Sequence, residues 1–154
     1  FYSASKALFQ ELWSEQNYAG RNGSYLFRIR MPFGKDTDPK NLLTKLRTYK
    51  KLVNFENSVS NLEEVAKAAV QFALTQPEPG IYNCVNPGSV TTYQIAEMMG
   101  LEKEWLEQDA FMETVRAPRS NCTLDTTKMQ RMFAFKPAKD ALYEAVKFIN
   151  SIPL

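Results

Sequence analysis

The stretch Tyr-Leu-Phe-Arg-Ile-Arg-Met-Pro at positions 25–32 decides the fold class of this sequence. Its aromatic and β-favouring residues, closed by a proline, predict a strand. Alternation places Leu26, Arg28 and Arg30 on one face of that strand and the apolar residues between them on the other. Such a strand suits a sheet whose two faces are covered unequally.

Helices and strands alternate on both sides of this strand. Residues 2–17 contain no glycine or proline and predict a helix. Asp38 followed by Pro39 predicts the start of a second helix, which reaches about Tyr49. The other expected elements are strands at 52–55 and 80–85, helices at 60–74, 91–100, 102–108 and 137–150, an extended segment at 111–115 and a short helix after Asp125. This alternation indicates an α/β fold.

Two details of the expected helices bear on packing. Ser60 and Glu63 have the spacing of a capping box, which would begin the helix at 60–74. The last helix carries a row of apolar residues that we expect to face the core. They are Ala141, Leu142, Ala145, Val146 and Phe148.

Composition excludes several classes of protein. The chain has 154 residues, 44% of them hydrophobic, and a net charge of +2, which is typical of one globular domain. This charge supports neither a nucleic-acid partner nor a basic membrane-binding face. No apolar run approaches the ~20 residues that span a bilayer, so we expect a cytoplasmic protein.

The metal-ligating and nucleophilic residue types are scarce. There is no histidine, and Cys84 and Cys122 lie far apart in the sequence, so we expect no metal site and no disulfide framework. Cys84 lies within a predicted strand. We interpret it as a small buried residue and not as a nucleophile.

The pair Tyr2 and Lys6 carries the clearest chemical signal. Four residues apart on a helix, the two side chains share one face. A lysine cation near a phenol favours the phenolate, and the phenol can then exchange a proton with a carbonyl or alcohol. The spacing alone favours an exposed helix pair, and we interpret the similar pair Tyr143 and Lys147 in that way.

The motifs that accompany this pair resemble those of a known family. Their order along the chain is similar to that of the extended short-chain dehydrogenase/reductases. Within them, the plant-type UDP-4-keto-6-deoxyglucose 3,5-epimerase/4-reductases and the bacterial dTDP-4-dehydrorhamnose reductases are the most similar. The motifs are residues 1–7, 28–32, 41–45, 53–54 with 57–58, 86–88 and 117–121.

The resemblance implies a reduction that uses NADP(H) or NAD(H). By this resemblance Tyr2 protonates the C4 oxygen of a keto sugar and Lys6 holds the ribose of the nicotinamide. Met31 and Pro32 form a wall against the nicotinamide. Lys45 matches a lysine that moves protons in the 3,5-epimerisation, although a solvated lysine fits its helix equally well.

The resemblance also implies a nucleotide-diphosphate sugar as substrate. Asn41, Arg119 and Asn121 match positions that contact it, and a guanidinium such as that of Arg119 suits a pyrophosphate oxygen. An ion pair within the loop is the other interpretation of Arg119. The resemblance leaves UDP or dTDP, and NADPH or NADH, undecided.

Several parts of the family pattern are absent. The sequence lacks the glycine-rich phosphate loop, the residue that reads the ribose, the upstream Ser/Thr and the cysteine partner of the epimerase lysine. Because the chain begins at Phe1, we expect a C-terminal half whose cofactor is bound mainly by the missing N-terminal half. Alone it should be inactive. A non-catalytic module that binds nucleotide sugars, or a regulatory one, is the alternative.

This view predicts how one fragment, residues 1–154, is organised. Residues of about 1–32 and 60–86 would form the catalytic helix and the last strands of a doubly wound, Rossmann-like parallel sheet. About 33–59 and 87–154 would form a small substrate-binding subdomain. The unpaired edge of the sheet would favour self-association or a homodimer.

Overall fold

The predicted strand at 25–32 is two strands separated by a sharp turn. A computed structural model of the chain describes residues 1–18, 23–116 and 119–152, without the side chains of Tyr2 and of 15–18. Strand β1 (Tyr25–Arg28) ends before Met31, which has a left-handed backbone with φ 44°, and β2 (Pro32–Phe33) follows. This conformation is uncommon for a residue with a side chain, and it redirects the chain.

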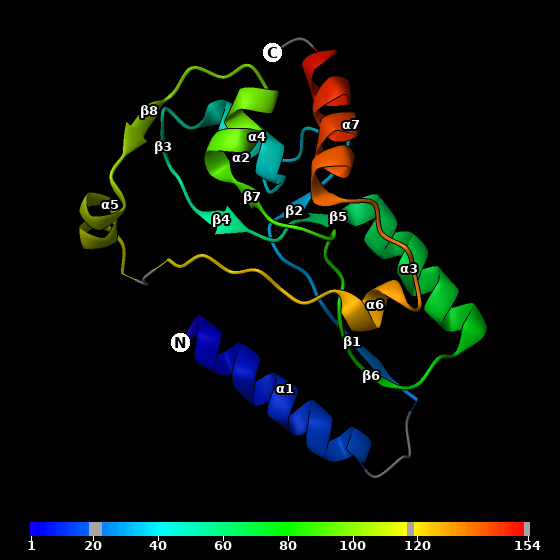
Figure 1. Ribbon diagram of the computed structural model, residues 1–154. Helices are drawn as coiled ribbons and strands as arrows, with labels where there is room; N and C mark the ends of the chain where they lie inside the picture. Colours follow the sequence, from blue (N-terminus) through cyan, green and yellow to red (C-terminus); the bar gives the residue numbers. More distant parts are fainter. Residues whose placement is uncertain (19–22, 117–118, 153–154) are drawn as a thin grey trace.

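Parallel pairing confirms the expected α/β class (Figure 1). Strand β1 pairs with β6 (Gly80–Asn83), β2 with β5 (Ser60–Asn61), and β3 (Lys51–Val53) with β8 (Glu104–Leu106), all in parallel. Strand β4 (Glu56–Asn57) pairs with β7 (Val90–Thr91) in the antiparallel sense. Within the described residues, the strands thus form four separate two-stranded sheets.

Seven helices connect these strands in the described part of the chain. They are α1 (Tyr2–Tyr18), α2 (Leu42–Thr48), α3 (Leu62–Thr75), α4 (Thr92–Met98), α5 (Gln108–Thr114), α6 (Thr127–Gln130) and α7 (Ala138–Asn150). Thr91 caps α4 with Gln94 in a reciprocal capping box. The predicted helices at 2–17, 91–100 and 137–150 are confirmed.

Two helix starts differ from the prediction. Helix α2 begins after Asn41, whose side chain accepts from the Leu43 amide, and not after Asp38. The Asp38 carboxylate accepts from the Lys40 amide in the turn that precedes the helix. Helix α3 is capped by Asn61, whose Oδ1 accepts from the amides of residues 63 and 64. Ser60 lies in β5 and is wholly buried.

The predicted helix at 102–108 and the extended segment at 111–115 are wrong. Residues 104–106 form β8, in which Trp105 packs against Tyr93 at a ring distance of 5.3 Å. Residues 108–114 form α5, where Phe111 packs edge-on against Phe55. Long-range partners therefore override local preference in both segments.

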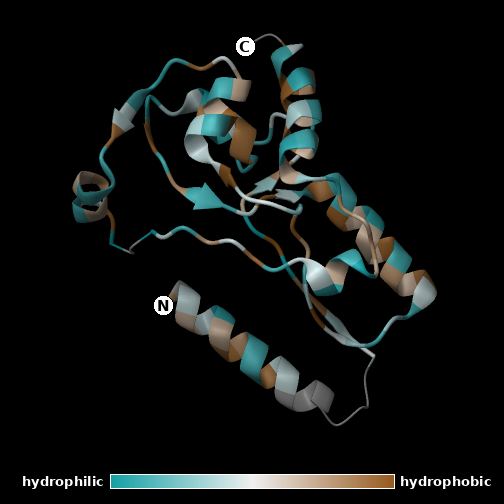
Figure 2. Ribbon diagram, viewed as in Figure 1, coloured by the Kyte–Doolittle hydropathy of each residue, from teal (hydrophilic) through white to brown (hydrophobic). Residues whose placement is uncertain are grey.

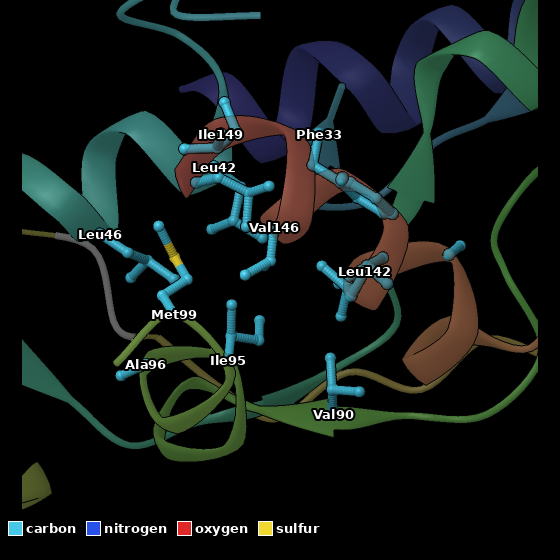
Figure 3. Packing of buried hydrophobic residues seen from close by; sticks show 14 of the residues in the cluster. Phe33, Leu42, Leu46, Val90, Ile95, Ala96, Met99, Leu142, Val146 and Ile149 are labelled. Atoms are coloured by element: carbon cyan, nitrogen blue, oxygen red, sulfur yellow. The ribbon is translucent and has the colours of Figure 1, made fainter. Parts of the chain in front are cut away.

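The buried apolar residues form two clusters. Cluster one lies between α2, α4 and α7 and includes Phe33, Leu43 and Ile149 (Figure 3). Phe148, expected to face this core, is 43% exposed, because the inward position belongs to Ile149. Cluster two packs α3 against β6 and the segment that contains α6. Its buried members are Ala68, Phe72, Tyr82, Cys84, Met129 and Phe135.

Helix α1 lies beside the β1–β6 pair (Figure 1). The Arg28 guanidinium of β1 donates two hydrogen bonds to Gln10 Oε1 of α1, at 3.1 and 2.5 Å. Leu8, Phe9 and Leu12 are at least half exposed, and Figure 2 shows the apolar stretches along this helix. The expected self-association stays a prediction. None of the described helices is long and apolar enough to span a membrane.

A row of buried polar residues joins the two clusters, and we call it the polar seam. It consists of Asn57, Ser58, Ser60, Asn61 and Asn86. The Asn86 amide side chain accepts from the Asn61 N–H and donates to Glu64 Oε2 and to the Lys136 carbonyl. One wholly buried side chain therefore connects three segments that are distant in sequence.

Replacing the centre of the seam should destabilise the chain. Asn86→Ala leaves the Asn61 amide and the Glu64 carboxylate without this partner, and we expect a loss of about 3 kcal/mol in the free energy of unfolding. Urea denaturation measures it. Asn150→Ala is the control, because Asn150 is exposed and its bond to the Met99 carbonyl is 3.5 Å long. An equal loss in both variants would contradict the role of the seam.

The two thiols should differ sharply in reactivity. Burial raises the pKa of Cys84 to about 12, and at pH 8 only about one Cys84 in ten thousand is then a reactive thiolate. Cys122 is half-buried. We expect a thiol reagent to modify Cys122 alone in the native chain and both cysteines in urea. Resistance of native Cys122→Ser to the reagent confirms the assignment, whereas rapid labelling of Cys84 would refute it.

Candidate functional site

A pocket of about 330 Å³ lies just beyond the carboxyl end of β1. Ligands of α/β proteins bind at this edge of parallel strands. The turn at 30–32, helix α2, strand β3 and residues 119–120 line the pocket. Four of the predicted site residues, Met31, Pro32, Lys45 and Arg119, contribute to its wall.

Hydrogen bonds from the polar seam fix the position of the turn at 30–32. The Arg30 amide donates to Ser60 Oγ at 2.9 Å, and Ser60 Oγ in turn donates to the Cys84 carbonyl. After the turn, β2 pairs with β5, so the left-handed backbone at Met31 is fixed on both sides. Such uncommon backbone conformations concentrate at functional sites.

Helix α2 presents Lys45 to the pocket, and Asn41 fixes where this helix begins. Asn41 is 5% exposed. Its Oδ1 accepts from the Leu43 amide and its Nδ2 donates to the carbonyls of Gly34 and Asp36. These bonds give Asn41 a structural role in the loop before α2. Its predicted contact with a nucleotide sugar stays a prediction.

The segment after the predicted motif at 117–121 brings Arg119 to the rim. Arg119 is exposed and lines the pocket, whereas residues 117–118 lie outside the described residues. Asn121 is outside the described pocket wall, and its Oδ1 accepts from the Glu56 amide at 2.8 Å. Asn121 therefore fastens this segment to β4.

Of the helical pair at the start of the chain, Lys6 is the residue whose side chain the structure describes. The expected helix is present, but the side chain of Tyr2 lies outside the described residues. Lys6 is exposed and is not among the residues that line the pocket. The structure therefore gathers Met31, Pro32, Lys45 and Arg119, and it does not bring Lys6 to them.

Sequence reasoning missed two pairs of residues in the pocket. Arg30 lines it and donates from Nε and Nη2 to Oδ1 of Asn57. An arginine within the mostly apolar stretch 25–32 was the available signal. Phe55 and Phe111 supply an edge-on aromatic pair with a ring distance of 6.1 Å, but 55 and 111 are too far apart in sequence to suggest it.

The charged side chains that line the pocket are all cationic in the part of the chain that the structure describes. Five cationic side chains line it, and no carboxylate does so within the described residues. The five are Arg30, Lys40, Lys45, Lys51 and Arg119. Of these, Lys51 forms an ion pair with Glu104 at 2.7 Å. The arrangement suits an anionic ligand with an apolar part.

The pocket beside Trp105 does not combine cationic residues with the predicted site residues. A space of about 520 Å³ beside Trp105 carries Glu107 and Asp109 and none of the predicted site residues. In the described part of the chain, no group of three or more His, Cys, Asp or Glu side chains is placed to hold a metal ion.

Sequence comparison identifies the relatives. A bifunctional dTDP-4-dehydrorhamnose 3,5-epimerase/dTDP-4-dehydrorhamnose reductase of Arabidopsis thaliana is 37% identical over 142 residues, covering 86% of this chain and 44% of that protein. The same plant has a second relative that is 34% identical, covering 86% of this chain and 20% of that protein. It is a trifunctional UDP-glucose 4,6-dehydratase/UDP-4-keto-6-deoxy-D-glucose 3,5-epimerase/UDP-4-keto-L-rhamnose-reductase. The chain is homologous to these plant enzymes. The predicted resemblance is therefore confirmed.

Solved structures agree with this relationship. The L780 UDP-rhamnose synthase of Acanthamoeba polyphaga mimivirus has a TM-score of 0.74 and 25% identity, covering 79% of this chain and 45% of that one. RMD from Pseudomonas aeruginosa complexed with NADPH shares the fold, with a TM-score of 0.66 and 12% identity. The match covers 97% of this chain and 55% of that one. The chain spans less than half the length of the two plant relatives. No model of a protein family matches it.

Proposed function

We propose that the chain is the substrate-binding part of an NADPH-dependent reductase of a 4-keto-6-deoxy nucleotide sugar. The supporting observation is the single pocket in which Met31, Pro32, Lys45 and Arg119 meet. Its cationic and apolar lining suits a nucleoside diphosphate that carries a deoxysugar. Homology to enzymes named for dTDP- and UDP-linked sugars points to the same class of substrate.

The residues present fit one side of a nicotinamide. The Met31–Pro32 turn gives an apolar surface at the carboxyl end of β1, where dinucleotides bind in doubly wound sheets. The sequence carries no glycine-rich turn for the pyrophosphate. We therefore assign most of the NADP(H) contacts to a dinucleotide-binding part outside these 154 residues. When bound, the reduced nicotinamide supplies the hydride.

The chain's own residues then bind the sugar and move protons. Tyr2 donates a proton to the C4 oxygen, and Lys6, one helical turn away, favours the phenolate that remains. Arg119 bonds an oxygen of the diphosphate from the rim. Lys45 removes and returns protons next to the ketone if the enzyme is also a 3,5-epimerase.

A non-catalytic module that binds nucleotide sugars is the second candidate. Met31, Pro32, Lys45 and Arg119 line the pocket, whereas Lys6 is exposed on α1 and is not among the described residues of the pocket wall. A chain that binds sugar nucleotides without reducing them would have this arrangement.

Calorimetric titration tests whether the pocket works without a cofactor. We expect UDP or dTDP to bind to this polypeptide, NADPH to give no saturable heat, and uridine to bind far more weakly because it lacks the diphosphate. Arg119→Ala should weaken the diphosphate about tenfold. Binding of NADPH without either nucleotide would contradict the assignment of the pocket.

The activity of a fusion protein distinguishes the reductase hypothesis from the hypothesis of a non-catalytic binding module. The chain is joined to the part of the Arabidopsis bifunctional enzyme that the match leaves uncovered, and NADPH oxidation with the keto sugar is followed. Tyr2→Phe should reduce kcat at least a hundredfold, because the proton donor is lost. Lys45→Met should keep the reduction of an already epimerised substrate and stop deuterium exchange at C3 and C5. Full activity of Tyr2→Phe would refute its role, and an inactive fusion that still binds UDP would favour the module.

A further inference from the structure

Arg30 is the most firmly held cation of the pocket. Its Nε and Nη2 atoms donate to Asn57 Oδ1 at 3.1 and 2.6 Å, and its amide donates to Ser60 Oγ. Asn57 is 5% exposed and Ser60 is wholly buried. Both the backbone and the side chain of Arg30 are therefore attached to the polar seam.

The partner of this guanidinium is neutral. Within the described residues no carboxylate lies within ion-pair distance of Arg30, and its Nη1 has no hydrogen-bond acceptor. Asn57 occupies one edge of the planar guanidinium, so the other edge remains available to a ligand. A half-buried positive charge without an anionic partner is stabilised by an anionic ligand.

We propose that Arg30 binds the diphosphate of the nucleotide sugar and that Asn57 is its positioning residue. This inference rests on the proposed function and adds a residue to it. The diphosphate is the only part of such a substrate with full negative charge, and a guanidinium bonds it through two parallel N–H groups. Arg119 reaches from the exposed rim, whereas Arg30 is fixed in the wall.

Two substitutions at Arg30 measure this interaction. Calorimetry of the 154-residue chain with UDP, dTDP and inorganic pyrophosphate should show affinity reduced about 30-fold in Arg30→Gln and about tenfold in Arg30→Lys, because an ammonium cannot replace the planar fork. Arg28→Gln is the matched control. Arg28 is also half-buried and donates two bonds to one amide oxygen, that of Gln10, but does not line the pocket.

Asn57→Asp distinguishes ligand binding from a structural role. The carboxylate keeps the acceptor for Arg30 but neutralises its charge, so the folded chain should retain its urea midpoint or exceed it. Affinity for the diphosphates should nevertheless fall at least tenfold. A purely structural Arg30 would predict unchanged affinity in this variant.

The outcomes separate the two proposals. If the unsubstituted chain binds none of the three diphosphates, the proposed function and this inference both fail. If it binds them and Arg30→Gln loses no more affinity than Arg28→Gln, only the role of Arg30 is overturned. Loss of affinity in Arg30→Gln and Asn57→Asp, with an unchanged Arg28→Gln, establishes that role.

Discussion

The carboxamide of Asn86 is the interaction on which the rest of the molecule depends. It is wholly buried and bonds the start of α3, the Glu64 carboxylate and the Lys136 carbonyl. Apolar packing alone would let the two clusters slide against each other, since contacts between aliphatic side chains have no preferred direction. Hydrogen bonds that are buried must be satisfied, so they admit one arrangement only.

The same seam decides the shape of the pocket. Ser60 binds the backbone before Met31, and Asn57 binds the guanidinium of Arg30. A turn that is unfavourable for an isolated methionine is stable here because buried oxygens hold Arg30 before it and the pairing of β2 with β5 holds the chain after it. The wall of the site and the core of the protein are therefore one structure. Changes at buried Asn or Ser positions will alter the pocket without touching a ligand.

Sequence analysis identified the elements whose signals are local. The helices at 2–17 and 137–150 carry their own propensity and spacing, and the motifs pointed to Lys45 and Arg119 before any fold was known. The segment at 102–115 could not be predicted, because β8 exists only through its pairing with β3. The cap at Asn41 was also hidden, since Asp38 offers the same chemistry three residues earlier. The contact between Arg30 and Asn57 joins residues whose proximity follows only from the fold.

The parallel pairings connect residues that are far apart along the chain. Tyr25 lies opposite Gly80, and Lys51 lies opposite Glu104. At a synthesis rate of about 5–20 residues per second, β1 leaves the ribosome some seconds before its partner exists. During that interval its N–H and C=O groups and apolar side chains remain open to other chains. Nascent copies translated close together on one message should consequently be the most vulnerable to mispairing.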